Sequence, residues 1–219
     1  NVGLDKTTCA NIASVDLLGK MLHSATAVWT TAGTGNLNSQ SANGLASIYS
    51  PSTLDNNAGS VLLTLTTTDI SNGCKPVSDN MILTILPAPT VNAGPDKTVC
   101  ADNTTVPVSG SITNATDIQW KTLGSGTIAD NTSLNTNYIL SSADTSAHAV
   151  NLVISSTGNG KCTTVYDTVI LFINPKPIVN TGIASICKPE NGSILNGTIL
   201  NAGGGLWSTS GTGTFSPNA

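Results

Sequence analysis

The chain has 219 residues, of which only 9% are charged, and its formal net charge is −4. This balance offers no basic surface to nucleic acid or to anionic lipid, so we predict neither nucleic-acid binding nor direct membrane insertion. The apolar content of 39% is sufficient for small cores. The sequence contains no apolar run of about 18 residues, the length that would predict a membrane span.

One pattern of residues occurs almost three times along the chain. A cysteine is followed twenty positions later by a tryptophan in each copy, and the three pairs are Cys9 and Trp29, Cys100 and Trp120, and Cys187 and Trp207. Such a repeat decides the architecture before any other signal. We therefore predict module one over residues 1–88, module two over 89–176, and the N-terminal half of a third module, incomplete in this segment, over 177–219.

Short segments with alternating apolar residues follow one another within each module. In module one we expect strands near 15–18, 27–31, 45–50, 61–66 and 77–85, and the same segments recur in module two. Strict period two, with turn signals between the segments and no helical periodicity, is typical of an antiparallel β-sandwich. We predict an all-β fold of immunoglobulin-like modules arranged end to end.

Aromatic residues and glycines hold fixed places in this pattern. We expect the mid-strand tryptophans and the matched tyrosines to be core residues, although an exposed tryptophan would suit sugar stacking. The glycine pairs are expected to form a turn between strands, because no helix follows that could make them a phosphate-binding loop. The core set is Trp29, Trp120, Trp207, Tyr49 and Tyr138, and the turn set is Gly33, Gly35, Gly124, Gly126, Gly211 and Gly213.

A Pro-x-Pro segment joins each module to the next. The two segments are Pro87 to Pro89 and Pro175 to Pro177. Because proline fixes φ and favours extended geometry, we expect a short, semi-rigid linker that aligns neighbouring modules.

The cysteines match no zinc-binding spacing and contain no CxxC motif. We expect one disulfide inside each complete module, Cys9 with Cys74 and Cys100 with Cys162, which leaves Cys187 unpaired in this segment. Each bridge would close a loop of more than sixty residues and contribute about 4 kcal/mol in the chain-entropy model. Such bridges indicate an oxidising, extracellular compartment.

Residues capable of catalysis are scattered. His23 and His148 occupy different places in the repeat, and no paired carboxylates or nucleophile motif accompany them. We therefore predict no enzymatic activity and no required cofactor. Calcium remains an alternative, because oxygen-rich segments begin at Asp55, Asp102 and Asp130, although none matches a 12-residue calcium loop.

The opening motif of module two, Val91 to Val99 with the sequence Val-Asn-Ala-Gly-Pro-Asp-Lys-Thr-Val, resembles the PKD branch of immunoglobulin-like domains. The following tryptophan strand and Tyr138 extend the resemblance, whereas the usual acidic Asp-Phe-Gly-Asp-Gly turn is replaced by Thr-Leu-Gly-Ser-Gly. A PKD-like topology implies that the first strand and the last strand of a module are neighbours, so the expected disulfide would fasten one edge.

The whole pattern is similar to the tandem repeats of SprB-type motility adhesins, very large surface proteins of gliding Bacteroidetes. The Cys-x-x-Val-x-Asp motif that begins at Cys162 and the Pro-x-Pro joints belong to this pattern. The resemblance implies type IX secretion, attachment to outer-membrane machinery, and contact of the filament with a surface polysaccharide or substratum.

We thus expect a structural segment of a cell-surface adhesin filament whose immediate partners are neighbouring modules of the same chain. Two alternatives stay open. The modules could recognise a glycan or protein through their loops or tryptophan face, or they could be accessory modules of a secreted hydrolase.

Overall fold

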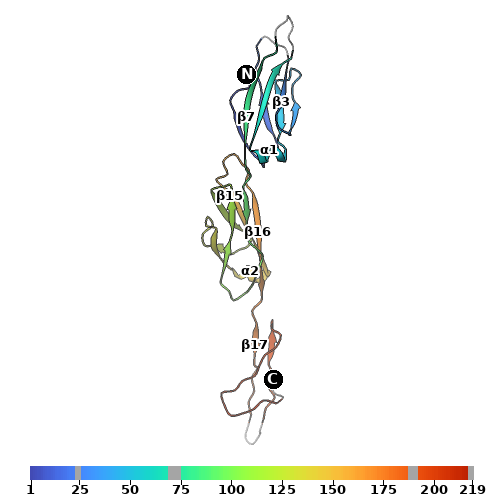
Figure 1. The fold of residues 1–219 in the computed structure, drawn as a ribbon. Helices are drawn as coiled ribbons and strands as arrows, with labels where there is room; N and C mark the ends of the chain where they lie inside the picture. Colours follow the sequence, from blue (N-terminus) through green and yellow to red (C-terminus); the bar gives the residue numbers. More distant parts are fainter. Residues whose placement is uncertain (23–25, 69–74, 187–191, 217–219) are drawn as a thin grey trace.

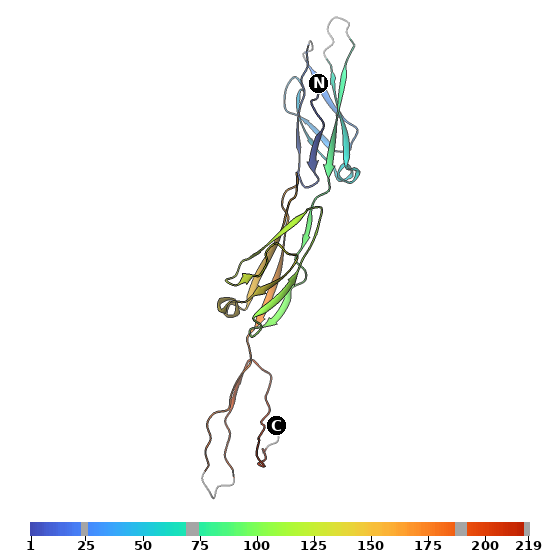
Figure 2. The same ribbon diagram turned by 90° about the vertical axis from the view of Figure 1, so that its left-hand side faces the viewer.

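The computed structural model describes residues 1–22, 26–68, 75–186 and 192–216. Two β-sandwich modules follow one another along an extended chain, and a small third unit lies at the C-terminal end (Figure 1, Figure 2). The predicted all-β, immunoglobulin-like architecture with modules arranged end to end is confirmed.

Module one consists of two facing sheets. The first sheet has the order β1-β7-β6-β3 and the second has the order β2-β5-β4. The strands are β1 (Lys6–Cys9), β2 (Val15–Leu18), β3 (Ala27–Thr31), β4 (Asn36–Ser39), β5 (Ala46–Ser50), β6 (Ser60–Thr67) and β7 (Ser78–Leu86).

Module two repeats this arrangement and adds a small ladder. Its sheets have the orders β9-β16-β15-β12 and β10-β14-β13, and β8 pairs with β11. The strands are β8 (Thr90–Asn92), β9 (Lys97–Cys100), β10 (Thr105–Ser109), β11 (Ser111–Thr113), β12 (Asp117–Thr122), β13 (Thr127–Ile128), β14 (Asn135–Ile139), β15 (Ala149–Thr157) and β16 (Tyr166–Asn174).

Period-two alternation places every second side chain of the long strands in a core, because successive residues of a strand point to opposite faces. Each module therefore has its own apolar cluster. The first includes Trp29, Leu63 and Leu83, and the second includes Trp120, Leu152 and Leu171.

The opening strand of each module pairs in parallel with the last strand, unlike the antiparallel pairing elsewhere in the sheets. Cys9 lies opposite Leu86 at the end of β7, and Cys100 lies opposite Asn174 at the end of β16. The parallel pairing arises because the chain enters and leaves a module in the same direction. Both cysteines consequently lie at the C-terminal end of their module, beside the linker.

Two short helices were not expected from the sequence. They are α1 (Thr53–Ala58) and α2 (Ser142–Ala147), and each begins with a capping box. A six-residue helix is too short to produce a recognisable helical period, but the Ser-x-x-Asp pattern at Ser52 and Ser141 is a capping-box signal that a local inspection can find.

The third unit begins as module two does. Its β17 (Ile178–Asn180) pairs with β18 (Thr198–Leu200) in the register that β8 and β11 use. Its large apolar side chains are mostly exposed, among them Ile183, Ile194 and Leu206. The described part of this unit therefore has the first ladder of a module without a closed core.

Candidate functional site at the module junction

The tryptophans of the two closed modules are core residues. Trp29 and Trp120 are buried, and each indole N–H donates to a backbone carbonyl, that of Leu45 or Ser133, at 3.1 Å. Neither ring offers a free face for sugar stacking. Trp207 is half-buried, with its ring centroid 6.2 Å from that of Phe215.

The buried tyrosine of module one belongs to a network around Asp55. The Tyr49 hydroxyl donates to Asp55 Oδ2 at 2.8 Å, and the backbone N–H of Ser52 donates to the same oxygen at 2.8 Å. Asp55 Oδ1 accepts from the Thr34 N–H at 2.9 Å. The carboxylate thus joins helix α1, strand β5 and the turn after β3.

Burial alone would raise the pKa of Asp55, since it disfavours the charged form. The hydrogen bonds donated by Ser52, Thr34 and Tyr49 outweigh that effect and hold the pKa at about 2, below its ordinary value of 3.8. Burial also raises the pKa of Tyr49, and the neighbouring Asp55 carboxylate adds to this. The carboxylate therefore stays ionised and fully engaged, which suits a structural role.

Module two repeats the network at Tyr138 and Asp144. The hydroxyl-to-carboxylate distance is 2.9 Å, and Ser125 N–H donates to Asp144 Oδ1 at 2.9 Å. The hydrogen bonds again lower the pKa of Asp144 against the opposing effect of burial.

The turn glycines are needed for close approach to this network. A Cβ on Gly35 would overlap the Ser50 carbonyl oxygen and lie 2.7 Å from the Tyr49 hydroxyl. Gly33, Gly124 and Gly126 are crowded in the same manner, whereas Gly211 and Gly213 have open surroundings in the third unit.

Within the described ranges, no group of three or more His, Cys, Asp or Glu side chains could hold a metal ion. Both Asp55 oxygens accept protein hydrogen bonds, and Asp130 Oδ1 accepts from the backbone and the hydroxyl of Thr132. His148 lies in the left-handed conformation that ends α2. His23 lies outside the described residues.

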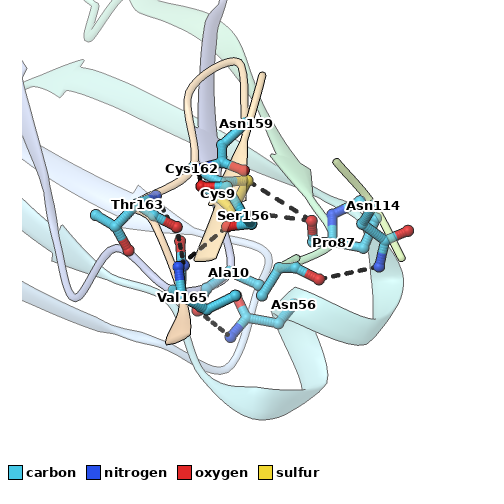
Figure 3. Close-up of a disulfide and its surroundings, with 12 residues drawn as sticks. Cys9, Ala10, Asn56, Pro87, Asn114, Ser156, Asn159, Cys162, Thr163 and Val165 are labelled. Atoms are coloured by element: carbon cyan, nitrogen blue, oxygen red, sulfur yellow. Dashed lines mark hydrogen bonds between the residues drawn. A yellow bond between two sulfur atoms is a disulfide. The ribbon is translucent and has the colours of Figure 1, made fainter. Parts of the chain in front are cut away.

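A disulfide links modules one and two at their junction. Cys9, at the end of β1, is bonded to Cys162, in the loop between β15 and β16, with a Cα–Cα distance of 5.0 Å (Figure 3). Both sulfur atoms lie near the carbonyl oxygen of Pro87 in the linker, at 3.8 and 3.6 Å. Cys9 is completely buried.

The predicted disulfides within modules are therefore wrong for Cys9 and Cys162, which bond to each other across the junction. The resemblance correctly implied that the first and last strands are neighbours. Because they run parallel, however, Cys9 lies beside the C-terminal end of β7, whereas the prediction required a partner at the start of that strand. Cys100, expected to bond to Cys162, is a free thiol. Cys74 and Cys187 lie outside the described residues.

Hydrogen bonds reinforce the disulfide. The Asn11 side chain donates from Nδ2 to the Thr163 carbonyl at 3.0 Å and accepts at Oδ1 from the Thr163 N–H at 3.2 Å. This reciprocal pair resembles one step of a β-ladder and fixes the loop of module two against module one. Asn56 of α1 also reaches the junction, where its Nδ2 donates to the Ala10 carbonyl at 3.5 Å (Figure 3).

In each linker, a backbone carbonyl accepts a hydrogen bond from an asparagine of the unit that follows. Asn114 donates from Nδ2 to the carbonyl of Ala88, between the two linker prolines, at 2.9 Å. Asn201 donates in the same way to Lys176 in the second linker at 3.1 Å. Both asparagines have positive φ, 56° and 60°. Pro89 is buried at the first junction, whereas Pro175 and Pro177 are exposed at the second.

These junction residues were missed in the sequence. The repeat places Asn114 and Asn201 at matching positions ahead of their tryptophans, and that match was a usable signal. No sequence signal distinguishes a bridge within a module from one between modules, because the same repeated cysteine positions are compatible with both pairings.

An open depression of about 740 Å³ lies at the other end of module one, where Leu22, Leu65 and Val77 are among its lining residues. Apolar side chains form most of its surface, and Asn1, Lys20 and Asp79 are among its polar lining residues. No helix among the described residues has the length and apolarity required to cross a membrane.

No protein-family model matches the sequence, and no curated protein matches it as a relative. Solved structures of extracellular β-sandwich proteins are similar at low identity. The insect immune protein hemolin matches with 13% identity over 80% of this chain and 46% of its own, at a TM-score of 0.44. Extracellular cadherin domains 3–6 of protocadherin gamma B2 match with 13% identity over 80% of this chain and 47% of their own, at a TM-score of 0.37. Immunoglobulin domains 1–5 of Sidekick-1 match with 13% identity over 82% of this chain and 38% of their own, at a TM-score of 0.38. The chain spans slightly less than half the length of the hemolin structure and of the protocadherin segment.

Proposed function

We propose that this chain is a structural repeat segment of a very large secreted cell-surface adhesin, and that its modules form the stalk of a filament. The filament serves surface attachment and gliding motility, in line with the resemblance to SprB-type repeats and PKD-like domains. The same resemblance supports a location outside the cell, with export by the type IX system and attachment to outer-membrane machinery.

The interlocked junction is the observation that carries this proposal. A disulfide, a reciprocal Asn11–Thr163 pair and the Asn114–Ala88 contact all connect module one to module two. A stalk must transmit force from module to module, and a covalent bond between modules resists separation more strongly than a linker alone. The buried aromatic residues and engaged carboxylates support structural roles rather than catalysis.

The alternative is an accessory or binding segment of a secreted hydrolase. The apolar depression near Leu22 and Val77 favours it, because an apolar concave surface is the usual form of a ligand site. Its polar lining groups are engaged within the module, since the Asn1 ammonium donates to the Lys20 carbonyl and Asp79 Oδ2 accepts from the Val2 N–H, so we place this function second.

The size of the native polypeptide separates the two functions. Cells would be surface-labelled, and an antibody to module two would detect the labelled protein on a denaturing gel after reduction. A labelled band of several hundred kilodaltons is expected for a repeat filament. A band with room for only a few modules beside a catalytic domain, or a band protected from the label, would overturn the stalk and favour the accessory segment.

A further inference from the structure

We propose that Cys100 forms a disulfide with the loop cysteine of the module that follows module two, so that the array is cross-linked at successive junctions. The inferred partner is a cysteine at the position of Cys162, between the last two strands of that following module. This inference rests on the proposed tandem array and adds a covalent connection that the array alone does not require.

Cys100 occupies the place in module two that Cys9 occupies in module one. Each cysteine ends the opening strand and pairs in register with the last residue of the final strand, Leu86 or Asn174. The turn that follows is also the same: the Ile12 N–H donates to the Cys9 carbonyl oxygen at 2.9 Å, and the Asn103 N–H donates to the Cys100 carbonyl oxygen at 3.0 Å. The backbone of Cys100 therefore has the same surroundings as the backbone of Cys9.

The two cysteines differ in what covers them. Cys9 is buried beneath the β15–β16 loop of the next module, to which it is bonded, whereas Cys100 is half-buried and free. The hairpin of a following module accounts for this difference. The described residues 177–186 and 192–216 form the counterpart of β8 and β11 and no counterpart of the β15–β16 hairpin. Cys100 thus has the position of a bridging cysteine without the loop that brings its partner.

An independent contact shows that the third unit begins against its linker as module two begins against the first linker. Asn201 donates to the linker carbonyl of Lys176, as Asn114 donates to Ala88. The ladders that follow the two linkers also share their register. A complete third module starting from this geometry would bring its own β15–β16 loop to Cys100.

The bond would form by thiol–disulfide exchange with a disulfide donor, either a dithiol oxidoreductase in its oxidised form or a small-molecule disulfide. The Cys100 thiolate attacks one donor sulfur and releases the other as a thiolate. The loop cysteine then attacks Cys100 Sγ and releases the second donor sulfur. Two protein thiols are oxidised, one donor disulfide is reduced to two thiols, and the two protons pass to the released thiolates.

The test uses a chain in which residues 1–176 are followed by a second copy of 89–176, since module two has a closed core of its own. After refolding in reduced and oxidised glutathione, free thiols are alkylated and the disulfides are mapped by mass spectrometry. We expect Cys100 of the first copy to be bonded to Cys162 of the second, with alkylation of Cys100 reduced about tenfold or more relative to chain 1–219.

The Cys9–Cys162 bond is the internal reference, and Cys100→Ser in the first copy is the matched control, which must leave Cys162 of the second copy open to alkylation. The proposal is overturned if Cys100 is alkylated as in chain 1–219, if it bonds elsewhere, or if neither junction bond forms. Because the mapping needs no cell surface, its failure is distinguishable from a failure of the adhesin proposal, which the native size decides.

Discussion

A single buried carboxylate organises the end of each module. Asp55 is 4% exposed and accepts hydrogen bonds from a tyrosine hydroxyl and two backbone N–H groups. Hydrogen bonds to a charged group contribute more than neutral ones, and a buried donor left without an acceptor is costly. The ionised form of Asp55 is therefore part of the folded structure.

The low pKa of Asp55 predicts a loss of stability in acid. Because its folded pKa of about 2 lies below the ordinary 3.8, the unfolded chain takes up a proton first as the pH falls. The contribution of the Asp55 carboxylate to the free energy of unfolding is complete above the ordinary pKa of 3.8, and it is lost as the pH falls through the folded pKa of about 2. Urea unfolding across this range should show the decline.

Two carboxylate variants serve as controls for the acid effect. Asp55→Asn should flatten the decline attributed to module one, because it removes the group that titrates. Asp102→Asn replaces an exposed carboxylate after β9 and should leave the decline unchanged. Equal pH profiles for the wild type and Asp55→Asn would contradict the assigned role.

At the scale of elements, the turn between β3 and β4 is shaped by the tyrosine network. Gly35 has an ordinary backbone conformation, but its N–H approaches the Tyr49 hydroxyl at 3.3 Å and leaves no room for a side chain. The glycine is required for space, a reason that the sequence pattern does not reveal.

Gly35→Ala should destabilise module one by about 1–3 kcal/mol, the usual cost of adding a methyl group to a packed site. Denaturant unfolding measures this loss. Gly204→Ala is the control, because an added Cβ there meets nothing within 4 Å, and its effect should stay near zero. Equal effects of the two substitutions would show that the turn can open to admit the methyl group.

The strands were predictable because period-two alternation is a local property of the sequence. The segment with Val61, Leu63 and Leu65 follows it without interruption, and β6 is found there. The direction of β1 relative to β7 is not local. It depends on where the chain enters the sandwich, and the disulfide prediction failed at this point because the pairing was inferred without strand direction.

At the scale of the whole molecule, the Cys9–Cys162 bond makes the two modules depend on each other. The closed loop spans a sequence separation of 153 and includes most of both modules. In the chain-entropy model, a loop of that length contributes about 5 kcal/mol, and native bridges in small domains contribute about 2–5 kcal/mol. The stabilisation is shared, because the loop gains its full freedom only when both modules are unfolded.

Replacement of both cysteines, Cys9→Ser with Cys162→Ser, should therefore lower the free energy of unfolding summed over the two modules by about 2–5 kcal/mol. Chemical denaturation followed at Trp29 or at Trp120, with the other two tryptophans replaced by phenylalanine in each background, separates the two modules. Cys100→Ser removes a thiol without removing a bond and should change the sum by less than about 0.5 kcal/mol. If the double variant loses no more than Cys100→Ser, the bond does not stabilise the pair, and its role would be limited to holding the modules in line.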